Sequence, residues 1–110
     1  MIDVLIVEDT DETARTIARF LAGYGFSVVV CGSIREALNT DRPRVAVVDN
    51  ELPDGTGADV IAALDGVPCI PITGSGEWIG PLPPAVPLLK KPFAMSELVA
   101  LVAARLAEGG

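Results

Sequence analysis

The stretch VAVVDNELPDG, Val45 to Gly55, carries an apolar run that leads directly into a carboxylate, Asp49, and then into a turn. Four consecutive apolar residues, three of them valine, are typical of a strand buried on both faces. A charged side chain at the end of such a strand costs free energy unless another group binds it. We therefore expect Asp49 to have a partner, and the ends of the other strands are where that partner should lie.

Short apolar runs recur along the chain and predict four further strands. They are residues 4–7, 26–30, 67–72 and a weaker run at 86–89. Amphipathic segments between the runs predict helices, because apolar residues there recur at helical spacing or follow a capping pattern. The expected helices are residues 11–23, ended by Gly23 or Gly25; residues 33–39, opened by the capping-box pair Ser33 and Glu36; residues 58–64; and a C-terminal helix with Ser96 as its N-cap.

This alternation of strand and helix predicts an α/β fold. Right-handed crossovers between parallel strands give a doubly wound, five-stranded parallel sheet in a three-layer sandwich, and ligands bind such folds at the carboxyl ends of the strands. The segment TGSGEWIGPLPPAVP, residues 73–87, holds four prolines and three glycines, so the fourth helix should be short or irregular. Residues 1–110 are expected to form a single domain.

Composition and net charge argue against several classes of protein function. The formal net charge of −7 argues against a nucleic-acid surface, and the absence of histidine excludes Ser-His-Asp and Cys-His catalysis. Cys31 and Cys69 lack the CxxC spacing of metal or redox sites and are expected to be buried core residues. The N-terminal stretch MIDVLIVED has neither a basic region nor a long apolar run, so we expect a cytoplasmic protein with no membrane segment.

Polar residues with a common chemistry follow the predicted strands. They are Glu8 and Asp9 after the first strand, Asp49 after the third, Thr73 after the fourth and Lys91 after the fifth. Three neighbouring carboxylates repel one another and favour a divalent cation, and oxygen ligands suit Mg²⁺. With Asp49 as a carboxylate nucleophile and with Thr73 and Lys91 contacting the transferred group, the set predicts a phosphoryl-acceptor site.

The motifs VLIVEDT, VAVVDNELPDGTG, PITGSG and LLKKPF, in this order, resemble the receiver domain of two-component response regulators over essentially the whole chain. The resemblance implies a flavodoxin-like receiver fold in which Asp49 is the phosphorylated aspartate, Glu8 and Asp9 are the acidic pair, and Thr73 and Lys91 are the signalling threonine and lysine. It also implies that the backbone carbonyl of Glu51 binds Mg²⁺. The Lys91–Pro92 peptide bond resembles the cis bond of the family.

Three features depart from the usual receiver. Leu88 stands where the family carries its switching Tyr or Phe, the prolines erode the fourth helix, and the intervals from Asp49 to Thr73 and on to Lys91 are short. With these departures, the chain resembles an atypical subgroup of stand-alone receivers. The resemblance implies that its partners are histidine kinases of the HWE or a related class. Trp78, in the eroded segment, has two interpretations: it packs in place of the missing helix, or it is an exposed contact for a partner.

The sequence therefore predicts a single-domain response regulator. It would take a phosphoryl group from a histidine kinase onto Asp49 with Mg²⁺, and would act on a downstream protein or a phosphotransfer protein, or as a phosphate sink. It would not be a conventional enzyme, because it would catalyse only its own phosphorylation and dephosphorylation. The alternative is a pseudo-receiver adaptor that is never phosphorylated. A nucleotide-binding or flavin-binding domain is disfavoured, because EDTDET, not a glycine-rich loop, follows the first strand.

Overall fold

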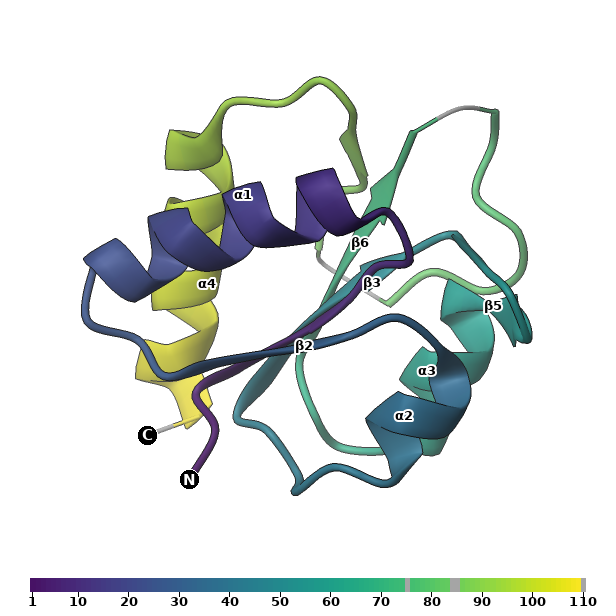
Figure 1. Cartoon of the computed structure of the whole chain (residues 1–110), viewed down its shortest axis with the longest axis horizontal. Coiled ribbons are helices and arrows are strands. Elements are labelled where there is room, and N and C mark those ends of the chain that lie inside the picture. The colour runs from purple at the N-terminus through teal and green to yellow at the C-terminus, as the bar shows by residue number, and fades with distance from the viewer. Residues whose placement is uncertain (75, 84–85, 110) are drawn as a thin grey trace.

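Five parallel strands form the central sheet of the computed structural model, which describes residues 1–74, 76–83 and 86–109. The strands are β1 (Val4–Val7), β2 (Val28–Cys31), β3 (Val45–Asp49), β6 (Cys69–Thr73) and β7 (Leu89–Lys90), in the order β2-β1-β3-β6-β7 (Figure 1). All neighbouring pairs in this sheet are parallel. The predicted doubly wound α/β fold is confirmed.

Helices cover both faces of the sheet. They are α1 (Asp11–Gly23), α2 (Ile34–Leu38), α3 (Gly57–Ala63) and α4 (Met95–Gly109). Figure 1 shows α1 and α4 on one face and α2 and α3 on the other, which makes three layers. The order of the strands reverses between β1 and β3, and in open parallel sheets this is the point at which a ligand site forms.

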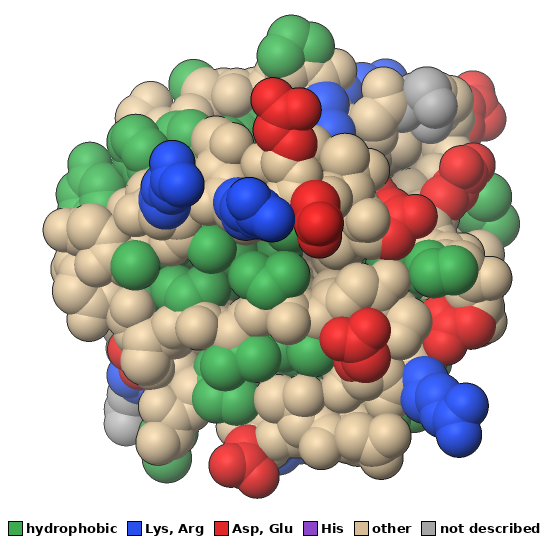
Figure 2. All heavy atoms as spheres, in the orientation of Figure 1, with side chains coloured by type: hydrophobic (Ala, Val, Ile, Leu, Met, Phe, Trp, Pro, Cys, Tyr) green, Lys and Arg blue, Asp and Glu red, His purple; other side chains and the backbone are tan. Residues whose placement is uncertain are grey.

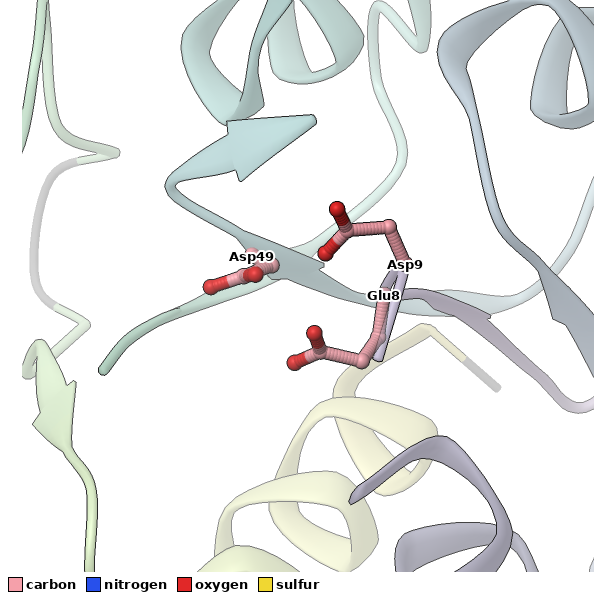
Figure 3. Close-up of side chains that lie close together, drawn as sticks. All are labelled: Glu8, Asp9 and Asp49. Carbon is pink, nitrogen blue, oxygen red and sulfur yellow. The ribbon is translucent and has the colours of Figure 1, made fainter. Parts of the chain in front are cut away.

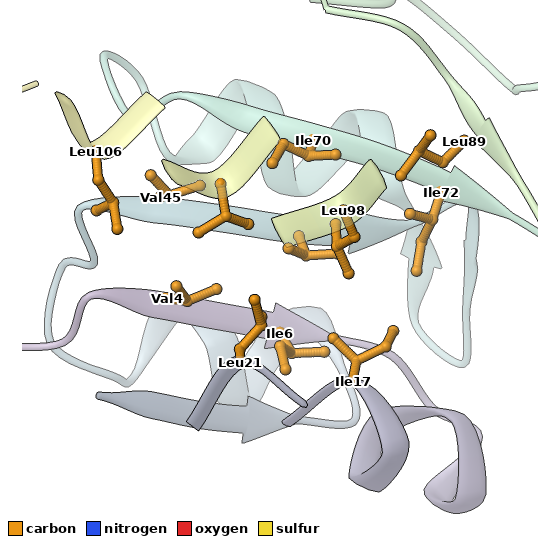
Figure 4. Close-up of a cluster of buried hydrophobic side chains, with 12 residues drawn as sticks. Val4, Ile6, Ile17, Leu21, Val45, Ile70, Ile72, Leu89, Leu98 and Leu106 are labelled. Atoms are coloured by element: carbon orange, nitrogen blue, oxygen red, sulfur yellow. The ribbon is translucent and has the colours of Figure 1, made fainter. Parts of the chain in front are cut away.

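The two faces of the sheet bury separate apolar clusters, because successive side chains of a strand point to opposite faces. Val4 and Ile6 of β1 pack with Leu98 of α4 in the first cluster, which Figure 4 shows together with residues of α1. Leu5 and Val7 of the same strand belong to the second cluster, under α2 and α3. Burial on both faces explains why β1 and β3 read as continuous apolar runs in the sequence.

Three predicted strands are displaced in the structure. The second begins at Val28 instead of residue 26, because Val28 is the residue that pairs with Val4 of β1. The fourth begins at Cys69 instead of residue 67, after Pro68, which has no amide hydrogen to donate. The last strand is only Leu89–Lys90, shorter than the predicted 86–89, and it follows Pro87.

The helix ends confirm two of the predicted signals and contradict one. The Ser33 hydroxyl caps α2 by accepting a hydrogen bond from the Glu36 amide at 3.1 Å, and α1 ends at Gly23. The predicted N-cap at Ser96 is wrong, because α4 already begins at Met95. The carbonyl of Ala94 accepts the Glu97 amide at 3.0 Å, so the chain has entered the helix before Ser96.

No helix forms in the described residues between β6 and β7, namely 74, 76–83 and 86–88, in agreement with the predicted loss of the fourth helix. A feature that the sequence did not predict is a small antiparallel hairpin of β4 (Glu51–Leu52) and β5 (Gly55–Thr56) directly after Asp49. The carboxylate of Asp54, at the tip of this hairpin, accepts the amides of Ile34 and Arg35 at 2.9 and 3.0 Å. The hairpin is thereby fastened to the start of α2.

The structure also places Cys31, Cys69 and Leu88, which the sequence singled out. Cys31 and Cys69 are buried and free, as predicted, and Leu88 is half-buried. Within the described ranges, no helix has the length and apolar character needed to cross a membrane. On the face of the molecule in Figure 2, acidic side chains are spread over the surface, and the Lys and Arg side chains are few and scattered.

Candidate functional site

The carboxyl ends of β1, β3, β6 and β7 meet at one pocket of about 210 Å³. Its lining includes five residues that the sequence indicated and three that it did not: Asp9, Asp49, Glu51, Thr73 and Lys91, and then Thr10, Asn50 and Gly74. Residues from distant parts of the chain meet here because parallel strands end at the same edge of the sheet.

Three carboxylates form the acidic side of the site; Asp9 and Asp49 line the pocket, whereas Glu8 lies beside them and does not line it. Each of Glu8, Asp9 and Asp49 contributes one carboxylate oxygen, and these three oxygens lie within 4.8 Å of one another. Figure 3 shows the three side chains extending from the ends of β1 and β3. Glu8 and Asp49 are buried and Asp9 is exposed, so the cluster opens to solvent on the side of Asp9. Three oxygen ligands on an open cluster fit Mg²⁺, which retains several waters when it binds proteins.

Lys91 provides the positive charge of the site. Its Nζ atom lies 2.5 Å from Glu8 Oε2 and 3.7 Å from Asp49 Oδ1. The Lys91 amide donates to the Thr73 carbonyl at 2.8 Å, which ties the residue to the end of β6. The Lys91–Pro92 peptide bond is cis, as predicted.

The charge balance around Asp49 favours a cation. Burial, followed by the repulsion of the Glu8 carboxylate, raises the pKa of Asp49 to about 7, although Lys91 acts in the opposite direction. One ammonium group therefore does not compensate the buried carboxylates. A divalent ion bound among them would, and this is the feature of the donor set that fits Mg²⁺ best.

Thr73 and Glu51 complete the set of residues that the sequence indicated. Thr73 is buried at the end of β6, and the preceding residue, Ile72, pairs with Asp49 of the adjacent strand. Glu51 lies in β4, two residues after Asp49, with an exposed side chain. Both line the pocket, while their roles toward a metal or a phosphoryl group stay predictions.

Sequence reasoning missed Asn50. This residue follows Asp49 and is 1% exposed, although its side chain is polar. Its amide side chain bonds the backbone of residues 77 and 79, far along the chain. The signal that could have found it is a second polar residue at the end of a fully apolar strand, since a buried amide requires hydrogen-bond partners.

Comparison with solved structures identifies the fold. The structure of the Francisella response regulator 1452 receiver domain superposes with a TM-score of 0.83 at 21% sequence identity and covers all of both chains. The fold is therefore that of a response-regulator receiver domain. No protein-family model matches the chain.

Sequence relatives point to the same family. The DNA-binding response regulator MtrA of Mycolicibacterium paratuberculosis is 34% identical over 94% of this chain and 50% of its own length. The acid tolerance regulatory protein ActR of Rhizobium meliloti is 37% identical over 67% of this chain and 42% of its own. The chain thus spans about half the length of the curated relatives it matches, or less. It belongs to the receiver domains of two-component response regulators.

Proposed function

We propose that this receiver domain accepts a phosphoryl group on Asp49 in a reaction that depends on Mg²⁺. The observation that carries the proposal is the cluster of Glu8, Asp9 and Asp49 oxygens within 4.8 Å of one another, with the Lys91 ammonium group 3.7 Å from Asp49. The cluster combines a nucleophilic carboxylate, a site for a divalent cation and a positive charge, which are the elements that phosphoryl transfer uses.

Each residue has a defined part in this proposal. Asp9 and Asp49, with Glu8 and the backbone carbonyl of Glu51, would hold Mg²⁺, which when bound would neutralise charge on the phosphoryl oxygens. An Asp49 carboxylate oxygen attacks phosphorus, so that an O–P bond forms while the N–P bond of the donor phosphohistidine breaks. The departing imidazole keeps the electron pair of that bond and takes up a proton.

Lys91 and Thr73 contact the acquired group in this proposal. The Nζ atom of Lys91 is close enough to Asp49 to bind an oxygen of a phosphoryl group there, and an ammonium group suits a phosphoryl oxygen. Thr73 lines the same pocket and offers a hydroxyl as a second contact. The Glu51 side chain, exposed at the pocket rim, would affect the rate at which water removes the group.

The biological setting is also a proposal. The phosphoryl donor would be a histidine kinase, of the HWE or a related class, and the recipient of the signal a downstream protein or a phosphotransfer protein. The chain would act in the cytoplasm as a switch that catalyses only its own phosphorylation and dephosphorylation. Free, buried cysteines are compatible with a reducing compartment. The adaptor alternative predicts the same fold with no phosphoryl acceptance.

Phosphoramidate tests this function, because it carries the P–N bond that a phosphohistidine donor carries. The protein is incubated with phosphoramidate and either Mg²⁺ or EDTA, and its intact mass is then measured before and after treatment with hydroxylamine. We expect one phosphoryl group with Mg²⁺ and none with EDTA, and hydroxylamine should remove the group because it cleaves acyl phosphates. A group that resists hydroxylamine would contradict an aspartyl phosphate.

A further inference from the structure

Asn50 joins two parts of the chain that are far apart in sequence. Its Nδ2 donates to the Glu77 carbonyl at 3.0 Å, and its Oδ1 accepts from the Ile79 amide at 2.8 Å. A carboxamide group offers a donor and an acceptor side by side. Asn is the residue that carries this group on a side chain of this length, so the two hydrogen bonds together require Asn. The side chain is buried, and loss of either bond leaves a polar group without its partner.

The segment that Asn50 holds also packs on the start of α3. A Cβ atom added to Gly57 would lie 2.6 Å from Cη2 of Trp78, so the indole ring rests directly against the Gly57 backbone. A Cβ added to Gly57 would also lie 2.3 Å from the Asp49 carbonyl oxygen. Trp78 is half-buried, and its Nε1 donates to the Pro81 carbonyl at 3.1 Å. The ring therefore packs on the start of α3, and part of it stays accessible to solvent.

The same residue contacts the acceptor. The backbone amide of Asn50 lies 2.9 Å from Asp49 Oδ1 and 2.9 Å from the Ile72 carbonyl, so it is shared between the reactive carboxylate and the adjacent strand. When Asp49 binds a cation or acquires a phosphoryl group, the charge on Oδ1 changes, and the balance between these two acceptors changes with it. Residue 50 is thus in direct contact with both the acceptor and the segment that carries Trp78.

We propose that Asn50 is a positioning residue that fastens residues 77–79 to the acceptor strand and couples the chemical state of Asp49 to the position of Trp78. The coupling rests on the proposed function, whereas the fastening does not. The Asn50 contacts connect the acceptor to the segment that carries Trp78, which is partly exposed at the surface. A shift in population between held and released segments would carry the signal.

Trp78 fluorescence tests the proposal, because this is the only tryptophan of the chain. Emission is excited where tyrosine does not absorb, and acrylamide quenching is measured without Mg²⁺ and then after loading with phosphoramidate and Mg²⁺, with intact mass as the measure of loading. The variants are Asn50→Leu, which removes both hydrogen bonds at similar volume, and Asn50→Ser, for use if the leucine variant does not fold. Asn39→Leu, at the exposed end of α2, is the matched control.

In the wild type and in Asn39→Leu, loading is expected to change the emission of Trp78. In Asn50→Leu, emission should already be shifted to the red and quenching increased before loading, and the change in emission per phosphoryl group gained, as measured by mass, should be smaller than in the wild type. Emission and quenching identical to the wild type in Asn50→Leu would overturn the fastening. A full response to loading in that variant, or no response in a loaded wild type, would overturn the coupling.

The two proposals fail in different ways in this experiment. If the wild type takes up no phosphoryl group, the mass measurement contradicts the proposed function. The comparison of Trp78 quenching without Mg²⁺ still decides whether Asn50 fastens the segment, because it requires no phosphorylation.

Discussion

The ammonium group of Lys91 contacts two carboxylates at the ends of different strands, Glu8 directly after β1 at 2.5 Å and Asp49 of β3 at 3.7 Å. The Glu8 side chain is fully buried, and Lys91 is its ion-pair partner. This pair links the residue after β7, at the edge of the sheet, to the residue after β1, further inside it. Lys91 therefore has a structural role in the metal-free protein beside its proposed role toward a phosphoryl group.

Removal of the Lys91 charge should destabilise the metal-free protein. In Lys91→Met the buried Glu8 carboxylate loses its ion-pair partner, and the expected loss in unfolding free energy is about 3 kcal/mol. Urea unfolding in EDTA measures the loss, and Lys90→Met, at the neighbouring exposed lysine, is the control. Adding Glu8→Gln to Lys91→Met should restore part of the stability. Equal stabilities for Lys91→Met and Lys90→Met would show that the pair contributes nothing.

The raised pKa of Asp49 predicts a pH dependence of stability without Mg²⁺. The folded pKa of about 7 exceeds the ordinary value of 3.8, so protonation of Asp49 favours the folded state. This contribution is complete below about pH 4 and is lost as the pH rises to about 7. Asp49→Asn removes the dependence, and its stability relative to the wild type should rise by roughly 2 kcal/mol or more over this range.

Denaturant unfolding at several pH values in EDTA checks this expectation. The matched control is Asp41→Asn, an exposed carboxylate before β3, at the opposite end of the strand from Asp49. A stability difference between Asp49→Asn and the wild type that stays flat from pH 4 to 7 would be inconsistent with a raised pKa.

Asp9 is the exposed member of the carboxylate cluster and offers a direct test of the metal site. Asp9→Asn should weaken Mg²⁺ binding by about tenfold or more, because the cluster loses one charged ligand. The increase in melting temperature on addition of Mg²⁺ reports the binding. Asp11→Asn, on the exposed side of α1, should leave the Mg²⁺ response as it is in the wild type. Equal responses in the two variants would remove Asp9 from the metal site.

The first turn of α3 predicts a local stability effect. Thr56 and Asp59 form a capping box, in which the Thr56 hydroxyl accepts the Asp59 amide and Asp59 accepts the Thr56 amide. Thr56→Ala should cost about 1 kcal/mol in unfolding free energy. Thr16→Ala, within α1, is the control and should be neutral or slightly stabilising, because alanine favours a helix interior. A Thr56→Ala variant as stable as this control would show that the cap contributes little.

The sequence predicted the architecture and five of the residues that line the pocket because both depend on short-range patterns. Runs such as VAVV are typical of parallel strands buried on both faces, and the residues that follow parallel strands lie at a common edge of the sheet. Among the boundaries that were predicted wrongly are the start of β2, which strand pairing sets, and the start of α4, which a hydrogen bond to a backbone carbonyl sets. Val28 begins its strand because it pairs with Val4, and the Ala94 carbonyl starts α4 before Ser96.

The contacts of Asn50 could not be predicted for a different reason. Nothing in the order of residues specifies that a side chain after β3 will bond a loop 27 and 29 positions later, since this depends on how that loop folds without a helix. The pairing of Lys91 with Glu8 likewise depends on the path of the chain after β6. The sequence indicated that Glu8 and Lys91 belong to the site but did not specify the atoms that meet.

The most direct test of phosphoryl acceptance at Asp49 is the intact mass of the wild type, Asp49→Asn and Asp41→Asn after incubation with acetyl phosphate and Mg²⁺. We predict a gain of one phosphoryl group in the wild type and in Asp41→Asn, no gain in Asp49→Asn, and no gain in any sample with EDTA. An Asp49→Asn protein that gains phosphate to the same stoichiometry as the wild type would contradict the assignment.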